Sequence, residues 1–211
     1  MLQLQYHPKC SLSQRIIILL DDKGIEYKKI DVSIKVNSNL KEMGGVFPLL
    51  IIDVDKNNRK SDLLIADSNL ACEYLVEKYP NSYQQFHFLP FNPEDLAKIR
   101  QIINDLENDL FKPAAFLDMN IEQEDKNEVK LNQLKIINTL DQIAENFTIN
   151  KKMEFFCSSS FTILDIYLLV VLFKLKDYGI EIKENWEAMM KYSENSKIGQ
   201  ICKSYNPLLF N

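Results

Sequence analysis

The sequence is poor in the residues that mark several common classes of site. It has only five glycines, two histidines and four cysteines in 211 residues, and no two cysteines form a Cys-x-x-Cys pair. His7 and His87 lie far apart, so no metal-ligand spacing is present and we predict no metal site. The lack of a Cys-x-x-Cys pair and of a signal peptide at the N-terminus predicts reduced thiols in a reducing cytoplasm.

An excess of positive charge and a long apolar run are also lacking. The formal net charge is −5, so we expect no direct binding of nucleic acid, although a basic protein surface remains a suitable partner. The longest apolar stretch, Ile163 to Phe173, is interrupted by Asp165 and predicts a buried helix, with no membrane span. The composition is that of a globular protein with a sizeable core, in one domain or two small ones.

The first 80 residues alternate between strand and helix signals. Strands are expected at residues 2–6, 26–32, 49–53 and 63–65, and helices from Ser11 to a C-cap at Gly24 and from Asp67 to Tyr79. The apolar face expected for the second helix is Leu70, Cys72, Tyr74, Leu75 and Tyr79. A short strand–helix–strand unit predicts parallel pairing of its strands. The order β-α-β, then β-β-α, is the thioredoxin-like arrangement.

The remainder of the chain is predicted to be helical. Prolines 80, 90 and 93 mark residues 81–93 as a linker, which leaves domains at 1–80 and 94–211. Helices are expected from Glu94 to about Leu117, bent at Pro113, and at residues 127–147 and 162–176. The stripe expected to be buried in the second of these is Val129, Leu131, Leu134, Ile136, Ile137, Leu140 and Ile143. The fold class is therefore an α/β N-terminal domain followed by an all-α C-terminal domain.

Pro48 comes directly before the third strand, in the segment Val46-Phe47-Pro48. A cis peptide at Phe47-Pro48 would turn the backbone of Phe47 outward, where a peptide-like ligand could pair with it as an extra strand. A trans proline that simply begins the strand explains the segment equally well.

Two pairs of residues open helices and are candidates for chemistry. Cys10 and Ser11 begin the first helix, where the positive end of the helix dipole favours a thiolate or another anion. Asp67 and Ser68 begin another helix and could hold the charged ends of an amino acid. Helix capping alone also accounts for both pairs. The capping-box spacing of Thr162 and Asp165 indicates folding alone.

These motifs, in this order and at these spacings, resemble the glutathione transferase superfamily along the whole chain. The resemblance implies that Val46, Phe47 and Pro48 hold the cysteinyl backbone of glutathione, and that Asp67 and Ser68 hold its γ-glutamyl end. Cys10, Ser11 and Leu12 resemble the bacterial beta class, in which the cysteine is the reactive thiol. No cofactor is required under this interpretation, and glutathione is the candidate ligand.

The second half resembles a narrower subgroup, the stringent starvation protein A family of RNA polymerase-binding proteins. The matching stretches are residues 88–93 with Arg100, residues 105–111, residues 154–167 and residues 179–182. The resemblance implies a dimer, either of two copies or with a related chain, and a patch that binds RNA polymerase. The residues assigned to that patch are Tyr83, His87, Phe88, Pro90 and Phe91.

Two functions follow from the resemblance. The first is a non-enzymatic regulator that binds RNA polymerase and modulates transcription under stress, starvation or in virulence. The second is an active glutathione transferase or thiol reductase that uses Cys10, with Ser11 beside it. The helical-domain resemblance favours the regulator.

Overall fold

The structure is a computed structural model that describes residues 2–33, 48–52, 63–79, 88–122, 125–149, 155–156, 161–187, 189–191 and 199–200. The chain divides into two compact units, Met1–Pro80 and Asn81–Asn211, and each is considered by itself. Four of the predicted site residues lie outside the described residues. These four are Val46, Phe47, Tyr83 and His87.

The first unit contains a four-stranded mixed sheet in the order β2-β1-β3-β4. Its strands are β1 (Leu2–Tyr6), β2 (Lys28–Asp31), β3 (Leu49–Ile52) and β4 (Leu63–Ile65). β1 is parallel to β2 and antiparallel to β3, and β3 and β4 form an antiparallel pair. The sequence-based prediction of a thioredoxin-like arrangement is confirmed.

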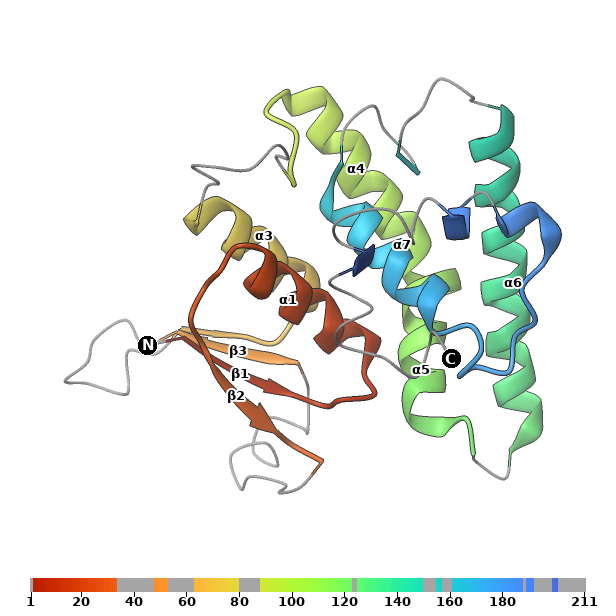
Figure 1. Ribbon diagram of the computed structural model, residues 1–211, viewed down its shortest axis with the longest axis horizontal. Helices are drawn as coiled ribbons and strands as arrows, with labels where there is room; N and C mark the ends of the chain where they lie inside the picture. The colour runs from red at the N-terminus through yellow and green to blue at the C-terminus, as the bar shows by residue number, and fades with distance from the viewer. Residues whose placement is uncertain are drawn as a thin grey trace. The chain divides into compact units, whose positions relative to one another are not determined.

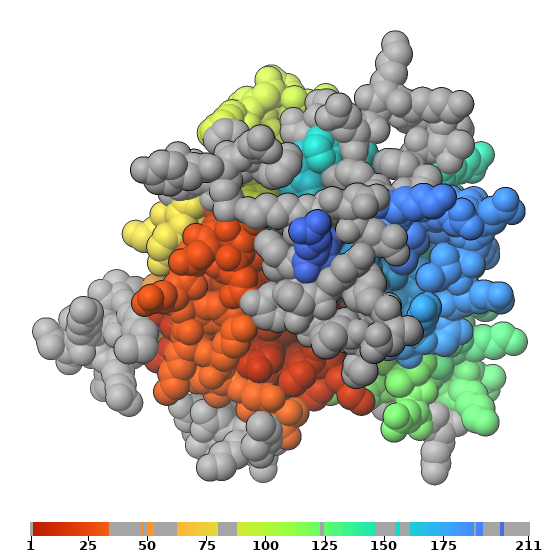
Figure 2. Space-filling model, viewed as in Figure 1, coloured from red at the N-terminus to blue at the C-terminus, as the bar shows by residue number. Residues whose placement is uncertain are grey.

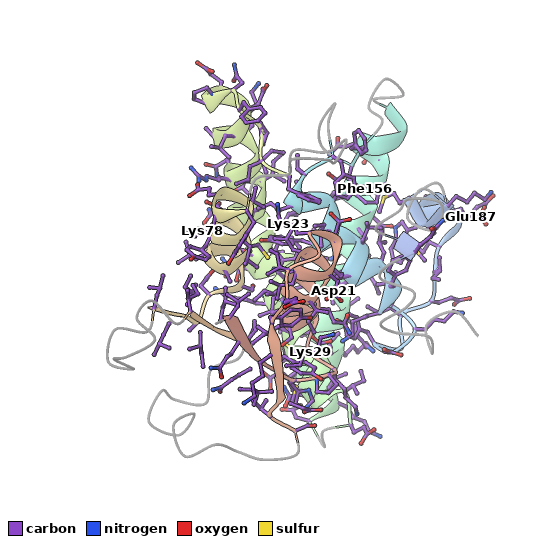
Figure 3. The ribbon with its side chains drawn as sticks, turned by 60° about the vertical axis from the view of Figure 1, so that its left-hand side comes forward. Asp21, Lys23, Lys29, Lys78, Phe156 and Glu187 are labelled. Carbon is purple, nitrogen blue, oxygen red and sulfur yellow. The ribbon has the colours of Figure 1, made fainter. Side chains whose placement is uncertain are left out.

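Two helices, α1 (Ser11–Asp22) and α3 (Ser68–Lys78), pack together on one face of this sheet (Figure 1). β1 and β4 run in the same direction, because both are antiparallel to β3, so the helices that follow them also run the same way. Their C-terminal ends are tied together, since Lys23 Nζ donates a 2.6 Å hydrogen bond to the carbonyl oxygen of Tyr79. Figure 3 labels Lys23 and Lys78 at these two ends. Gly24 ends α1 with φ = 63°, as the sequence predicts.

The edge strand β2 carries exposed, charged side chains. Lys28 and Lys29 are exposed on β2, which is orange in Figure 2. Asp21 of α1 lies 4.0 Å from Lys29 and accepts a 3.2 Å hydrogen bond from Tyr27 (Figure 3). Burial first, and then the charge and hydrogen bond of Asp21, raise the pKa of Tyr27, which keeps its hydroxyl a donor. Lysines on an edge strand disfavour pairing with another chain.

The predicted apolar face of α3 is only partly correct. Cys72 and Leu75 are buried, but Leu70 is 62% exposed and Tyr79 is also exposed. Leu70 lies in the first turn of the helix, away from the side that packs on α1. The prediction that Leu70 belongs to the core is therefore wrong.

In the second unit every described regular element is helical. The elements are α4 (Pro93–Leu106), η2 (Glu107–Phe111), α5 (Lys112–Asn120), α6 (Lys126–Ile149), α7 (Ile163–Phe173) and η3 (Glu184–Trp186). Every residue of α7 is buried, as its apolar sequence predicts, and this helix forms the core of the unit. None of the helices in the described part of the chain combines the length and the apolar character that crossing a membrane requires.

The helix expected from Glu94 to about Leu117 continues to Asn120, and its irregularity is a π turn, η2, just before Pro113. Proline has no N–H, so the carbonyl of Asp109 loses its usual helical donor. The hydroxyl of Thr139 on α6 donates to that carbonyl instead, at 3.2 Å. The π turn is thus stabilised by a contact from a neighbouring helix.

The stripe predicted for α6 is correct at its centre and wrong near its start. Ile136, Leu140 and Ile143 are buried, whereas Leu131 is 56% and Leu134 is 44% exposed. Residues of an α-helix are separated by about 100° each, so Leu131 and Leu134 lie on the side opposite the buried stripe. Apolar character alone does not place a residue on the core face.

A buried polar cluster ties α5 to the turn after α7. The ammonium group of Lys174 contacts the carboxylate of Asp118, and both side chains are almost fully buried. Tyr178 donates a 2.8 Å hydrogen bond to the same carboxylate. The charge of each partner is therefore compensated inside the core.

Candidate functional site

The strand pairing brings the predicted site residues of the first unit to one end of the sheet. Gln5 pairs with Leu49, and Leu50 pairs with Ile65. The C-terminal ends of β1 and β4 and the N-terminal end of β3 therefore lie side by side. These three ends lead to the five described residues of the predicted site in this unit: Cys10, Ser11, Pro48, Asp67 and Ser68.

Cys10 is held at the start of α1 by a tight turn. Its N–H donates to the carbonyl of His7 at 3.0 Å, with Pro8 in the second position of the turn, which proline favours. The N–H of His7 donates to Ser13 Oγ at 3.3 Å, so the turn is also fixed to the first turn of the helix. The carbonyl of Cys10 accepts from Gln14 at 3.1 Å, which makes Cys10 the N-cap residue.

The thiol of Cys10 contributes no capping hydrogen bond, and the residue is only 3% exposed. Ser11, at the next position, is fully buried. The positive end of the helix dipole favours an anion here, but a buried sulfur has little access to an electrophile in solution. The local field suits thiolate chemistry, whereas the accessibility of the sulfur does not.

Tyr6 ends β1 beside this turn and is half-buried. Burial first, and then the negative charge of Asp31 on β2, raise the pKa of the Tyr6 hydroxyl. That hydroxyl therefore remains protonated and able to donate a hydrogen bond near neutral pH.

Asp67 and Ser68 occupy the start of α3, at the same end of the sheet. Asp67 is exposed and is the N-cap residue: its Oδ1 accepts a 2.9 Å hydrogen bond from the N–H of Leu70. Ser68 is 7% exposed. Capping thus engages one carboxylate oxygen of Asp67 directly. Because α1 and α3 are parallel, the positive ends of both helix dipoles point to the same end of the sheet, which suits a negatively charged ligand.

The described part of the predicted partner-binding patch has a buried and an exposed half. Phe88 is 1% exposed, and its carbonyl accepts a 2.9 Å hydrogen bond from the N–H of Ile163, the first residue of α7. Its ring packs edge-to-face against Phe161, with ring centroids 6.0 Å apart. Pro90 is half-buried, and Phe91 is 81% exposed. Phe88 therefore anchors this segment, and Phe91 is its outward-facing residue.

The prediction from sequence missed a concave surface on α4, with a volume of about 440 Å³. Its lining residues are Pro93, Leu96, Ala97, Arg100, Gln101 and Asn104. We call this surface the α4 groove. The spacing of these residues, three and four apart, was a detectable signal, because such positions share one face of a helix. In the residues that the structure describes, no group of three His, Cys, Asp or Glu side chains could hold a metal ion.

Comparison with solved structures defines the class of fold. BphK, a bacterial GST, superposes with a TM-score of 0.75 at 17% identity, covering 97% of this chain and 99% of that one. A class Gtt2 glutathione S-transferase of Vibrio parahaemolyticus also gives a TM-score of 0.75, at 16% identity, covering 99% of this chain and 100% of that one. The chain has the glutathione transferase fold.

Comparison of sequences gives a narrower relationship. No protein-family model matches the chain. A stringent starvation protein A homolog of Haemophilus influenzae is 27% identical over 170 residues, which cover 79% of this chain and 71% of that protein. A homolog from Pasteurella multocida is equally similar, at 27% over 171 residues and the same coverage. The chain is therefore a glutathione transferase-fold protein related to stringent starvation protein A.

A shorter match is to a plant enzyme. The probable glutathione S-transferase DHAR4 of Arabidopsis thaliana is 39% identical over 74 residues, which cover 34% of this chain and 31% of that protein.

Proposed function

We propose that this protein is a non-enzymatic, dimeric regulator that binds RNA polymerase and modulates transcription under stress or starvation. The proposal is supported by its relationship to stringent starvation protein A homologues, which extends over 79% of the chain. The net charge of −5 suits a basic protein surface as the partner, and not a nucleic acid.

The difference in solvent exposure between Cys10 and Phe91 favours a regulator over an enzyme. Cys10, the thiol that an enzyme would use, is 3% exposed, whereas Phe91 in the partner-binding patch is 81% exposed. A nucleophilic thiol needs to reach its electrophile, and an interface needs an accessible aromatic anchor. The exposure pattern fits the second requirement.

The experiment is retention of purified bacterial RNA polymerase by the immobilised protein. The wild type is compared with Phe91→Ala and with the control Leu131→Ala, which removes a 56% exposed leucine from α6. We expect the wild type and the control to retain polymerase and Phe91→Ala to retain at least tenfold less, the loss typical of an aromatic anchor. Failure of the wild type to retain polymerase would refute the proposed function.

A second candidate function is that of a glutathione transferase or thiol reductase. It is favoured by the position of Cys10 as the N-cap of a 12-residue helix and by the similarity to the probable plant transferase. In this function the Cys10 thiolate attacks an electrophilic carbon and displaces its leaving group, or attacks one sulfur of a mixed disulfide and releases the other sulfur as a thiolate, with Ser11 beside it. The tripeptide is held by Val46, Phe47, Pro48, Asp67 and Ser68.

Calorimetric titration with millimolar glutathione tests this second candidate. Binding by the wild type that is abolished in Ser68→Ala, together with activity that is lost in Cys10→Ala, would favour the enzyme. If no heat is measured for the wild type, glutathione is not the ligand of this end of the sheet.

A further inference from the structure

The two edges of the sheet in the first unit differ in the side chains that they expose. At β2, Lys28 and Lys29 are exposed, and lysines on an edge strand disfavour pairing with another chain. At β4, Leu63 is 43% and Leu64 is 46% exposed, and no residue of the strand is charged. The β4 edge therefore lacks the protection that the β2 edge has.

The exposed apolar side chains of the first unit are confined to β4 and α3, which contact each other. In the described part of this unit the large apolar side chains that are exposed are Leu63, Leu64, Leu70 and Tyr79. Leu70 lies on α3, and Tyr79 is the C-cap of that helix. Exposed apolar side chains that gather on neighbouring elements indicate an interaction surface.

One row of the backbone groups of β4 is available to a further strand. The residues of β4 pair with residues 50–52 of β3, and β4 comes last in the sheet order β2-β1-β3-β4. The row of N–H and C=O groups that faces away from β3 is a template for pairing with another chain. Neighbouring residues of a strand point to opposite faces, so an added strand would cover both Leu63 and Leu64.

The sequence of β4 is complementary to itself in an antiparallel pair. With a two-fold axis at Leu64, this residue lies opposite its own copy, and Leu63 lies opposite Ile65 of the partner subunit. Both cross-strand pairs join apolar side chains, and such pairs are the unit of sheet stabilisation. An isologous contact of this kind is closed after two copies, because the same edge is used on both and the β2 edge is protected by its lysines.

The charges on either side of β4 also favour a second copy as the partner. Residues 56–62, which precede the strand, carry three cationic side chains and one carboxylate, whereas Asp67, which follows it, is exposed. In an antiparallel pair the chain that precedes one strand approaches the chain that follows the other. Opposite charges are therefore brought together at both ends of the contact.

We propose that β4 pairs antiparallel with β4 of a second copy of this chain, which joins the two four-stranded sheets into one. This inference rests on the proposed function, because it identifies the surface through which the regulator forms its dimer. The side chains at the centre of the contact are apolar, and the outward-facing backbone groups of the two strands satisfy each other. In the dimer the β4 edges are covered, and β2 forms each outer edge of the joined sheet.

Disulfide cross-linking tests the strand pairing directly. Leu64→Cys places two thiols opposite each other across the two-fold axis, with Cα atoms about 4.5–5.5 Å apart, within the range that a disulfide spans. We expect most of this variant to migrate as a covalent dimer on a non-reducing gel after oxidation by copper phenanthroline and air. The control Leu131→Cys, at a 56% exposed leucine of α6, should migrate as a monomer, as should the wild type, whose own cysteines give the background.

A lysine on β4 should separate the two copies. Leu64→Lys gives this edge the protection that β2 has, because it places an unpaired charge at the centre of the contact. We expect the dissociation constant of the dimer, measured by analytical ultracentrifugation, to rise by about tenfold or more. Leu131→Lys, the matched change at an exposed leucine of α6, should leave the dissociation constant within about threefold of the wild type.

The outcomes separate this inference from polymerase binding, because retention of purified RNA polymerase is measured on the same preparations. A monomeric wild type, or a Leu64→Lys variant that dimerises as well as the wild type, would overturn the pairing whether or not polymerase is retained. If Leu64→Cys forms no covalent dimer, the two β4 strands do not meet, and the inference is wrong. If Leu64→Lys stays dimeric but loses polymerase, the occupant of the β4 edge is polymerase. Thermal unfolding of each variant checks that these exposed substitutions leave the fold intact.

Discussion

The N-termini of α1 and α7 differ in how they are capped: side chains of the chain cap α7 but not α1. At α7, Thr162 and Asp165 form a reciprocal capping box. Asp165 also accepts a 3.0 Å hydrogen bond from the N–H of Phe156, and its side chain lies in the core. At α1, Cys10 is the N-cap and its side chain makes no capping hydrogen bond.

The difference in capping indicates that Asp165 at the start of α7 serves folding, whereas the start of α1 suits a ligand. Asp165 is engaged by several donors of its own chain and is covered by the core. The start of α1 lies instead beside the start of α3, at the end of the sheet where two helix dipoles converge. We therefore expect the polar groups of the second unit to determine stability, and those at the sheet end of the first unit to contribute less.

The largest effect is expected at the buried pair of Asp118 and Lys174. Asp118→Ala would leave the ammonium group of Lys174, which is 2% exposed, without its carboxylate. We expect a loss of about 3–5 kcal/mol in the free energy of unfolding, measured by urea denaturation. The double variant Asp118→Leu, Lys174→Met should be more stable than the single one. A single variant as stable as wild type would show that the pair does not hold the second unit together.

Removing the capping carboxylate of α7 should have the next largest effect. Asp165→Ala leaves the buried N–H groups of Phe156 and Thr162 without their acceptor, which we expect to cost about 2–3 kcal/mol. In the first unit, Asp67→Ala removes an exposed cap and should cost only about 1 kcal/mol. If Asp165→Ala and Asp67→Ala lost the same free energy of unfolding, the polar groups of the two units would not differ in their contribution to stability. Urea denaturation of both variants measures the difference.

Asp165 also predicts a dependence of stability on pH. Burial raises the pKa of Asp165 to about 6, although hydrogen bonds from Thr162 and Phe156 lower it in part. In the unfolded chain the pKa is about 3.9, so between these values the folded state binds the proton more tightly. The contribution of this group is therefore greatest below about pH 4 and is lost as pH rises to about 6. Asp165→Asn should remove this component from the pH profile of the unfolding free energy.

The π turn before Pro113 gives a smaller effect. Thr139→Val keeps the size of the side chain but removes the donor to the carbonyl of Asp109, and we expect a cost of about 1–2 kcal/mol. In the Pro113→Ala background the backbone regains an N–H, so the same substitution should cost less. Equal costs in the two backgrounds would mean that the hydroxyl does not replace the missing donor. The cycle is measured by chemical denaturation.

The sequence predicted the features that depend on local pattern. Gly24 ends α1, Asp67 caps α3, and Thr162 with Asp165 caps α7, because each signal lies within a few residues of the structure that it forms. The parallel pairing of β1 and β2 followed from the short strand–helix–strand connection. The pairing of β1, β3 and β4 in the structure places Cys10, Pro48, Asp67 and Ser68 at one end of the sheet.

The features that sequence reasoning missed depend on contacts between distant segments. Asp118 meets Lys174 and Tyr178 from another part of the chain, and no periodicity marks such a pair. Asp141 on α6 likewise accepts hydrogen bonds from Lys183, Asn185 and Trp186. Burial alone would raise the pKa of Asp141, but these hydrogen bonds and the charge of Lys183 outweigh it and hold the pKa below its ordinary value. Leu131 and Leu134 were misplaced because an apolar side chain does not itself indicate which face is covered.

The π turn at Glu107–Phe111 also sets how far α5 is rotated about the helix axis relative to α4. One extra residue in a turn rotates everything after it by about 100° relative to an uninterrupted α-helix. The face of α4 that carries Arg100 and Leu96 therefore does not continue onto α5, and α5 instead turns Asp118 into the core. If the residues of η2 closed as a regular α-helix with none deleted, Asp118 would turn onto the face of Arg100 and away from Lys174. The length of this one turn thus decides which residues the second unit displays and which it encloses.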